Sequence, residues 1–221
     1  MTIKKLLISN RGEIASRIIS SAHDMGICCV AIYTENDKDT PYVREADQAY
    51  KLSDSYLNSK EILDIALKAK VDAIHPGYGF LSENAAFANQ VKKLNIKWVG
   101  PSANAIKKMG DKLTAKEIAT KANVPTLPMT SDPKKANSIG FPILVKAAAG
   151  GGGKGMRIVN KAKDLKEAIK SAEREAEGGF GDKRVFLERY IPRSRHIEIQ
   201  ILGDSYGHIV HLGERECSIQ R

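Results

Sequence analysis

Cysteines and aromatic residues are scarce in the sequence, and long apolar runs are missing. The 221 residues include three cysteines, of which Cys28 and Cys29 are adjacent, and no CxxC spacing occurs. We therefore expect reduced, buried thiols rather than a disulfide or a metal site. No run of about 18 apolar residues is present, which argues against a transmembrane helix. The N-terminus has no long apolar segment or cleavage site of a signal peptide, so we expect a cytoplasmic protein without a membrane partner.

Aromatic residues make up 6% of the chain, too few for a base-stacking surface that binds nucleic acid. The formal net charge is +9, but the lysines are spread along the chain rather than clustered. This balance favours a polyanionic small ligand, such as a nucleotide, over nucleic acid. The hydrophobic share of 42% and the charged share of 28% are ordinary for a globular protein with a buried core.

Apolar segments alternate with amphipathic ones through the first hundred residues. Strands are predicted at 4–9, 27–34, 72–76 and 97–100, and helices at 12–26, 59–70 and 82–94. Strand and helix alternating at this rhythm predict an α/β fold with a doubly wound, parallel sheet.

The pattern changes between residues 101 and 135, which read as a helical segment followed by a proline-rich one. A second unit then follows. Its predicted elements are strands at 143–148, 156–160 and 184–191, a helix at 164–177, and a hairpin over 195–217. We place the domain boundary so that the first domain spans residues 1–112 and the second spans residues 113–221.

Four consecutive glycines interrupt the segment LVKAAAGGGGKGMRIV, residues 144–159. Glycine lets the backbone approach a phosphate because it has no Cβ. The P-loop pattern fails, since Ala148 replaces its first glycine and Gly155 replaces its hydroxyl residue. The dinucleotide pattern matches, but a strand follows where a helix is required, and the kinase pattern fails at Arg157. A glycine-rich hairpin that covers a triphosphate remains, with a flexible surface hairpin as the alternative.

Lys146 lies inside the apolar run PILVKAA. A buried ammonium group is costly unless it is paired, so this lysine is a candidate for binding phosphates beneath the glycine loop. A structural salt bridge is the alternative. His208 and His211 have the HxxH spacing of a metal pair, but in a strand this spacing puts the two side chains on opposite faces, and we expect no metal site there.

Six segments, in order along nearly the whole chain, resemble the biotin carboxylase component of biotin-dependent carboxylases, a member of the ATP-grasp superfamily. They are ISNRGEIASRI, DAIHPGYGFLSENAAFA, VGPSANAIKKMGDK, ILVKAAAGGGGKGMRIV, RVFLERYI and RHIEIQILGDSYGHIVHLGERECSIQR. The resemblance implies a Rossmann-like N-terminal domain followed by an incomplete ATP-grasp domain. It also implies a ligase that uses ATP, Mg²⁺ or Mn²⁺, and bicarbonate to carboxylate biotin. The implied partners are a biotin carboxyl carrier domain, a carboxyltransferase and a second copy in a homodimer.

By motif position, the resemblance also implies ten ATP-binding residues. Lys112 would hold the α-phosphate, Lys146 the α- and β-phosphates, and Glu188 the amino group of adenine. The others are the lid residues Gly152, Gly153 and Met156, the hinge residues Arg189 and Ile191, the ribose contact His196, and Gln220 facing the nucleotide. Arg17 resembles a residue of the homodimer contact. The alternatives are a surface ion pair for Glu188 and a solvated side chain for His196 or Arg17.

The resemblance has two departures within the chain: Met129 stands where the family usually has glycine, and Ser194 where it usually has proline. Family members also continue well beyond CSIQR, and the resemblance places the metal ligands and the catalytic residues there. We therefore assign no catalytic residue and no metal ligand to this chain, and we expect it to be inactive alone. The pattern is most like that of acyl-CoA carboxylase α subunits and pyruvate carboxylases. The alternatives are another ATP-grasp ligase, of the carbamoyl-phosphate synthase type, and a non-catalytic nucleotide-binding or dimerisation fragment.

Overall fold

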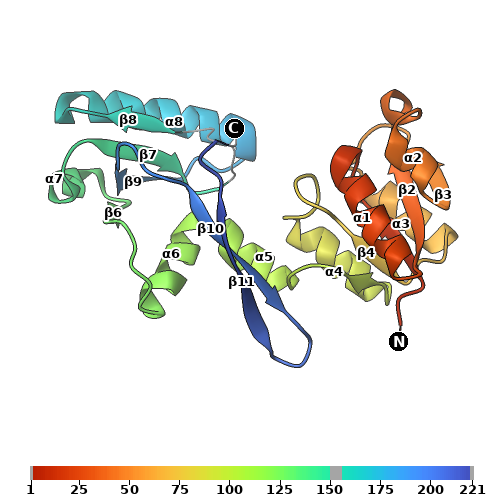
Figure 1. Ribbon diagram of the computed structural model, residues 1–221. Helices are drawn as coiled ribbons and strands as arrows, with labels where there is room; N and C mark the ends of the chain where they lie inside the picture. The colour runs from red at the N-terminus through yellow and green to blue at the C-terminus, as the bar shows by residue number, and fades with distance from the viewer. Residues whose placement is uncertain (1, 150–155, 220–221) are drawn as a thin grey trace. The chain divides into compact units, whose positions relative to one another are not determined.

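The computed structural model describes residues 2–149 and 156–219. Its contacts divide the chain into two units, Met1–Thr126 and Leu127–Arg221. Figure 1 labels the elements of both units. The helix α6 (Lys112–Lys121) contacts α5 (Ala103–Gly110) and belongs to the first unit, whereas the predicted boundary between residues 112 and 113 assigns all but its first residue to the second.

The first unit contains a five-stranded sheet with the strand order β3-β2-β1-β4-β5, and every pair of neighbours is parallel. The strands are β1 (Lys5–Ile8), β2 (Cys28–Tyr33), β3 (Gln48–Lys51), β4 (Ala73–His75) and β5 (Lys97–Trp98). The chain moves outward from β1 in both directions, which is the doubly wound arrangement that the sequence predicts. The short β3 and the helix before it, α2 (Pro41–Glu45), are not among the predicted elements.

Helices cover both faces of this sheet, so its strands are apolar on both sides. The helix α1 (Gly12–Asp24) and α2 pack on the face that carries Leu6, Ile8 and Ala31. The helices α3 (Ser59–Lys68), α4 (Ala85–Lys93) and α5 pack on the face that carries Leu7 and Val30. Side chains cap α3, α4 and α5, because Asn58, Asn84 and Ser102 each accept a hydrogen bond from a backbone N–H in the first turn of the helix that follows.

The second unit contains a four-stranded antiparallel sheet with the order β6-β9-β7-β8. Its strands are β6 (Met129–Thr130), β7 (Ile143–Ala147), β8 (Arg157–Val159) and β9 (Val185–Arg189). The helix α8 (Leu165–Phe180) lies along β7 and β8, as Figure 1 shows, and the short α7 (Ala136–Ile139) joins the same core. The three longer strands and α8 agree with the predicted elements, and β6 was not predicted.

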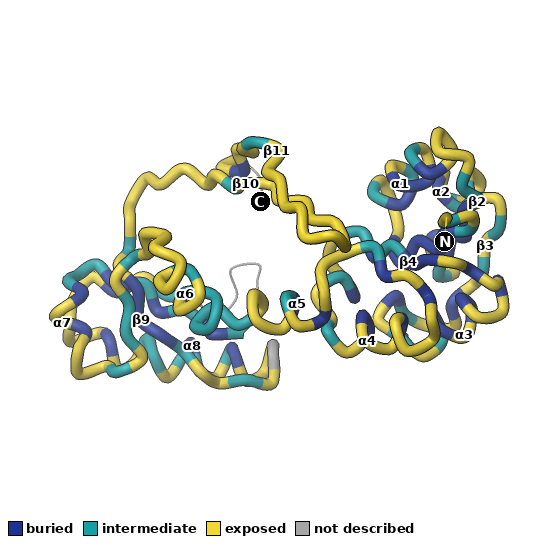
Figure 2. Tube along the Cα trace, turned by 90° about the horizontal axis from the view of Figure 1, so that it is seen from below, coloured by how far each residue is buried: buried dark blue, intermediate teal, exposed yellow. Residues whose placement is uncertain are grey.

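A separate two-stranded sheet ends the described part of the chain. The strands β10 (Ile197–Gly203) and β11 (Ile209–Glu216) pair in antiparallel fashion and confirm the predicted hairpin. At its turn, the carboxylate of Asp204 accepts hydrogen bonds from the backbone N–H groups of Tyr206 and His208. Most of the hairpin is exposed, as Figure 2 shows. In the described residues, none of the helices combines the length and the apolar character that crossing a membrane requires.

Candidate functional site

The four-stranded sheet of the second unit has one face buried against α8. Val145, Val159 and Leu187 form a core with residues of α8, and Ile143 belongs to the same cluster. Because side chains alternate along a strand, the neighbours of these residues in sequence point to the opposite face. That opposite face carries the candidate site.

Strand register shows which residues share this face. Residues directly opposite each other in neighbouring antiparallel strands point the same way. One row across β6, β9, β7 and β8 therefore consists of Met129, Glu188, Leu144 and Ile158. Lys146 lies two residues after Leu144 and opposite Phe186, so these two form the next row. We call the six residues the site face; they are Met129, Leu144, Lys146, Ile158, Phe186 and Glu188.

An ion pair occupies the centre of the site face. Nζ of Lys146 donates to Oε2 of Glu188 at 2.9 Å. The side chain of Glu188 is 6% exposed and that of Lys146 is 23% exposed, so both charges are largely removed from water. The ammonium also lies 5.9 Å from the ring centroid of Phe186, within reach of a cation–π interaction. The structural salt bridge kept open for Lys146 is therefore present, and its partner is the other residue that the resemblance assigns to the nucleotide.

This arrangement can recognise two ends of one ligand. The carboxylate of Glu188 accepts hydrogen bonds only, whereas the ammonium of Lys146 donates and carries positive charge. A ligand that offers an amino group to Glu188 and an anionic group to Lys146 can take over the contact that the two side chains make with each other. The apolar members of the row, Leu144 and Ile158, offer a surface on which a flat ring can pack.

Arg189 and Ile191 follow Glu188 in the chain and differ in their surroundings. The side chain of Arg189 leaves the site face, and its Nη1 donates to the carbonyl of Ile139 at 3.0 Å. Gly140 makes room for this contact, because a Cβ added there would lie 2.4 Å from Nη1 of Arg189. Arg189 can therefore offer a ligand its backbone while its side chain anchors the strand. Ile191 lies beyond the end of β9 and is 47% exposed.

The remaining predicted ligand residues lie elsewhere. Lys112 begins α6 in the first unit, next to the capping residue Asp111. Met156 directly precedes β8 and is 39% exposed. His196 is exposed just before β10, where its backbone N–H donates to Oγ of Ser218 at 2.8 Å. Gly152, Gly153 and Gln220 lie outside the described residues.

Sequence reasoning missed the apolar members of the site face. Strand alternation alone would have grouped Leu144 with Lys146, and Phe186 with Glu188. The positions of Met129 and Ile158 require the pairing of β6 with β9 and of β7 with β8, which no local signal in the sequence gives.

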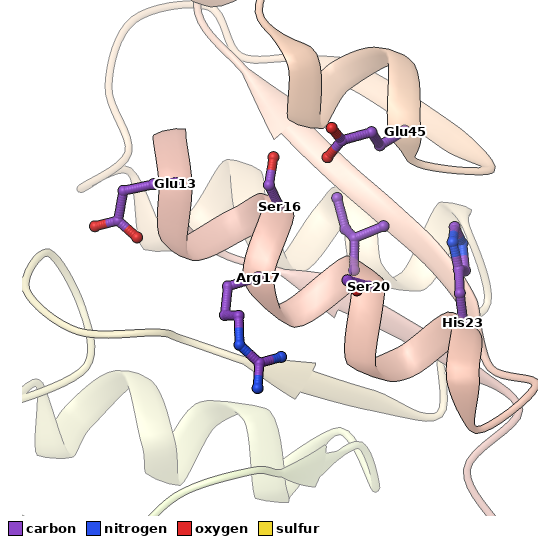
Figure 3. A pocket seen from close by; sticks show the side chains of 7 residues that line it. Glu13, Ser16, Arg17, Ser20, His23 and Glu45 are labelled. Atoms are coloured by element: carbon purple, nitrogen blue, oxygen red, sulfur yellow. The ribbon is translucent and has the colours of Figure 1, made fainter.

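A groove of about 580 Å³ lies beside α1 in the first unit. Figure 3 shows its lining along one side of α1, with Glu45 of α2 reaching toward that helix. Arg17, the predicted dimer residue, contributes to the lining, and its guanidinium donates to Oγ of Ser21 in the next turn. His23 ends the groove in the last turn of α1.

One group of three metal-ligating side chains occurs within residues 2–149 and 156–219, namely His23, Cys29 and Asp47. Oδ2 of Asp47 accepts hydrogen bonds from the backbone N–H of Cys29 at 2.7 Å and from Nε2 of His23 at 3.0 Å. Burial, with the nearby Asp47 carboxylate, raises the pKa of the Cys29 thiol to about 11. Cys29 is thus a buried thiol, as expected, while Cys28 is only partly buried.

Two family models match the chain, and together they cover nearly all of it. The biotin carboxylase N-terminal domain matches residues 2–106, and the ATP-binding domain of the carbamoyl-phosphate synthase L chain matches residues 86–221. Among curated proteins, biotin carboxylase 1 of Bacillus subtilis is 49% identical, over 99% of this chain and 52% of the relative. The pyruvate carboxylase of Staphylococcus aureus is 47% identical, over 99% of this chain and 20% of the relative.

The similar solved structures are also biotin carboxylases. A biotin carboxylase from Campylobacter jejuni, described as a β,γ-ATP complex, superposes with a TM-score of 0.95 and 46% identity, over all of this chain and 52% of the other. The biotin carboxylase domain dimer of Hydrogenobacter thermophilus 2-oxoglutarate carboxylase, in complex with MgADP, ADP and bicarbonate, superposes with a TM-score of 0.95 and 44% identity, over 100% of this chain and 51% of the other. The chain therefore spans about half the length of these biotin carboxylases and a smaller share of the pyruvate carboxylase.

Proposed function

The chain belongs to the biotin carboxylase family, and on that premise we propose that its second unit binds the nucleotide in an ATP- and bicarbonate-dependent carboxylation of biotin. The observation that carries this proposal is the Lys146–Glu188 pair on the site face. A carboxylate and an ammonium in a largely apolar surrounding match the amino group and the phosphates of an adenine nucleotide in charge and in hydrogen-bonding character. The nucleotide-bound relatives from Campylobacter jejuni and Hydrogenobacter thermophilus support the same assignment.

In this proposal the base of the nucleotide packs against β9 and β7. Glu188 accepts a hydrogen bond from the adenine amino group, and the backbone groups of Arg189 and Ile191 contact the edge of the base. Lys146 binds the α- and β-phosphates and cancels part of their charge. On binding, a phosphate oxygen takes the place of the Glu188 carboxylate as the partner of this ammonium.

The remaining assignments follow from motif position in the family resemblance. They assign Lys112 to the α-phosphate, His196 to the ribose and Gln220 to the nucleotide. Gly152, Gly153 and Met156 cover the phosphates, because glycine allows close backbone approach. Bound Mg²⁺ or Mn²⁺ would supply charge neutralisation between the β- and γ-phosphates. We assign no metal ligand and no catalytic residue to the described part of this chain.

The partners follow from the proposed reaction. The carboxyl acceptor is biotin on a carrier domain, and a carboxyltransferase passes the group to an acyl-CoA or a keto acid. The relatives include pyruvate carboxylases and the α chain of a methylcrotonoyl-CoA carboxylase, so both acceptor classes fit the family. We further propose a cytoplasmic homodimer in which the groove beside α1, with Arg17, forms part of the contact; one structural relative is described as a dimer.

A second candidate is a ligase of the carbamoyl-phosphate synthase type. The match of residues 86–221 to the ATP-binding domain of that enzyme favours it. The match of residues 2–106 to the biotin carboxylase N-terminal domain favours the first proposal, as do relatives at 47–49% identity over nearly the whole chain.

Equilibrium titration with ADP and GDP tests the nucleotide assignment. The chain should bind ADP at least about tenfold more tightly than GDP, because guanine presents a carbonyl oxygen to the Glu188 carboxylate where adenine presents an amino group. Equal affinity for the two nucleotides, or no affinity for ADP, would contradict the proposal.

A further inference from the structure

Met129 lies directly opposite Glu188 on the neighbouring strand β6, and this relationship points to a role in base recognition. We propose that Met129 limits the space beside the exocyclic amino group of the bound base, so that the site admits an unsubstituted amino group and excludes a substituted one. The inference rests on the proposed function, since it takes Glu188 as the acceptor for that amino group. It adds a specificity-determining residue that the ligand set above does not contain.

The hydrogen-bond pattern between β6 and β9 fixes how close the two residues are. The N–H of Arg189 donates to the carbonyl of Pro128 at 3.1 Å, so Pro128 and Arg189 form a hydrogen-bonded pair. Hydrogen-bonded and non-hydrogen-bonded pairs alternate along an antiparallel ladder. Met129 and Glu188, the next pair, are therefore a non-hydrogen-bonded pair. In such pairs the Cα atoms lie about 4.5 Å apart and the side chains approach each other closely.

The neighbour on the other side of Glu188 is farther away. The N–H of Tyr190 donates to the carbonyl of Pro142 at 3.1 Å, which makes Pro142 and Tyr190 a hydrogen-bonded pair. Two residues along the ladder, Leu144 and Glu188 form the same kind of pair, in which the Cα atoms are about 5.5 Å apart. Met129 is thus the side chain that most closely flanks the Glu188 carboxylate within its row.

The chemistry of methionine suits this position. Its side chain is apolar, flexible and polarisable, and it has no donor that would compete for the carboxylate. Glu188 is 5% exposed, so a group that bonds to it must enter a confined, largely dry place. Met129 is itself partly buried, and its position opposite Glu188 puts it beside the space that a substituent on the amino group would need.

An enlarged nucleotide and a smaller side chain test the proposal together. ADP and N6-benzyl-ADP are titrated against the unchanged chain, Met129→Gly, Met129→Ala and Met129→Leu. The unchanged chain and Met129→Leu should bind N6-benzyl-ADP at least about tenfold more weakly than ADP. Met129→Gly should remove most of that difference, and Met129→Ala part of it, because the space freed next to Glu188 accommodates the benzyl group.

Thr130→Gly is the matched control. Thr130 is the other residue of β6 and lies opposite Leu187, so its side chain is on the core side of the sheet. This variant weakens the same short strand without opening the site face. It should therefore keep the preference of the unchanged chain for ADP over N6-benzyl-ADP. If Thr130→Gly gains affinity for N6-benzyl-ADP as strongly as Met129→Gly does, the effect comes from loosening of β6. That result would overturn the proposal.

The outcomes separate this inference from the proposed function. If no variant binds ADP, the nucleotide assignment itself fails. If ADP binds but Met129→Gly and Met129→Ala discriminate as strongly as the unchanged chain, the nucleotide assignment stands and the role of Met129 is wrong. Should Met129→Gly not fold, as judged by circular dichroism, Met129→Ala decides.

Discussion

Nζ of Lys146 lies 2.9 Å from Oε2 of Glu188, although the two residues are 42 positions apart in the chain. The antiparallel register of β7 and β9 places them diagonally on one face of the sheet. Each charge thereby has a partner before any ligand arrives. The pair therefore satisfies the requirement that buried charges be compensated, and it holds in place the two groups that we assign to opposite ends of the nucleotide.

Replacing Lys146 and replacing Glu188 should lower the stability of the fold by different amounts. Lys146→Met removes the ammonium that contacts the more deeply buried Glu188 and should lower the free energy of unfolding by about 3 kcal/mol. Glu188→Gln keeps a hydrogen-bond acceptor beside the more exposed lysine and should cost about 1 kcal/mol. Urea unfolding of both variants measures the difference. A double variant, Lys146→Met with Glu188→Met, should be more stable than Lys146→Met alone; a larger loss in the double variant would contradict this account.

Gly140 should be intolerant of a side chain. Its φ of +78° is unfavourable for other residues, and an added Cβ would meet Nη1 of Arg189. Gly140→Ala should therefore lower the free energy of unfolding by about 1–3 kcal/mol, measured by urea denaturation. Gly178→Ala is the matched control: Gly178 lies in α8 with no atom near the position of an added Cβ, so this change should be neutral or stabilising by up to about 1 kcal/mol. Equal effects at the two positions would refute the explanation.

The first unit should show an acid-dependent loss of stability centred on Asp37. This carboxylate is 3% exposed and accepts hydrogen bonds from Nε of Arg11 at 2.9 Å, the hydroxyl of Tyr56 at 2.7 Å and Oγ1 of Thr34 at 3.1 Å. The hydrogen bond from Arg11 is the main cause that holds the pKa of Asp37 below its usual value. A carboxyl group with a lowered folded-state pKa stabilises the protein above the unfolded-state pKa of about 3.9, and that stability is lost as the pH falls through the folded-state value.

Asp37→Asn should accordingly cost about 2 kcal/mol of unfolding free energy at neutral pH. The difference between the variant and the unchanged chain should shrink as the pH is lowered below about 4, because Asp37 then takes up a proton in the unfolded state while its lowered pKa keeps it ionised in the folded state. Denaturant unfolding between neutral pH and about pH 3 measures this. A difference that stays constant over that range would show that the charge of Asp37 does not contribute.

Reversing the charge of Arg17 should affect self-association. If the groove beside α1 contributes to a dimer, Arg17→Glu should raise the dimer dissociation constant by at least about tenfold in sedimentation velocity experiments. Lys93→Glu makes the same charge change on α4, which packs on the opposite face of the five-stranded sheet, and should leave the dimer intact. A chain that is monomeric without any substitution, or that responds equally to both changes, would contradict the assignment of this surface.

Much of the fold could be predicted because apolar periodicity was strong where elements are long and buried. The amphipathic pattern of α1 and the continuous apolar run of β2 both gave the correct element within two residues of each boundary. The strand β3 was missed because it pairs with only one neighbour and is partly exposed, so its sequence QAYK contains few apolar residues. The pair of residues that forms β6 is too short to give any periodicity.

The sequence singled out the two charged residues of the site face, Lys146 and Glu188, but it predicted neither their contact nor the apolar residues beside them. Lys146 stood out as a charge within an apolar run, and the family resemblance identified Glu188. That they bond to each other depends on strands 42 residues apart pairing in one register, which is a tertiary property. The role proposed here for Met129 depends in the same way on the register of β6 against β9.

The central claim is that an adenine nucleotide binds on the site face with its phosphates at Lys146. Isothermal titration of the chain with ADP, compared with Lys146→Ala and with Lys163→Ala, tests it most directly, because Lys163 is an exposed lysine of the same unit. We predict that Lys146→Ala weakens ADP binding by at least about thirtyfold, through the loss of a charge-assisted contact, while Lys163→Ala leaves it unchanged. ADP binding that is equally strong in Lys146→Ala and in the unchanged chain would contradict the account.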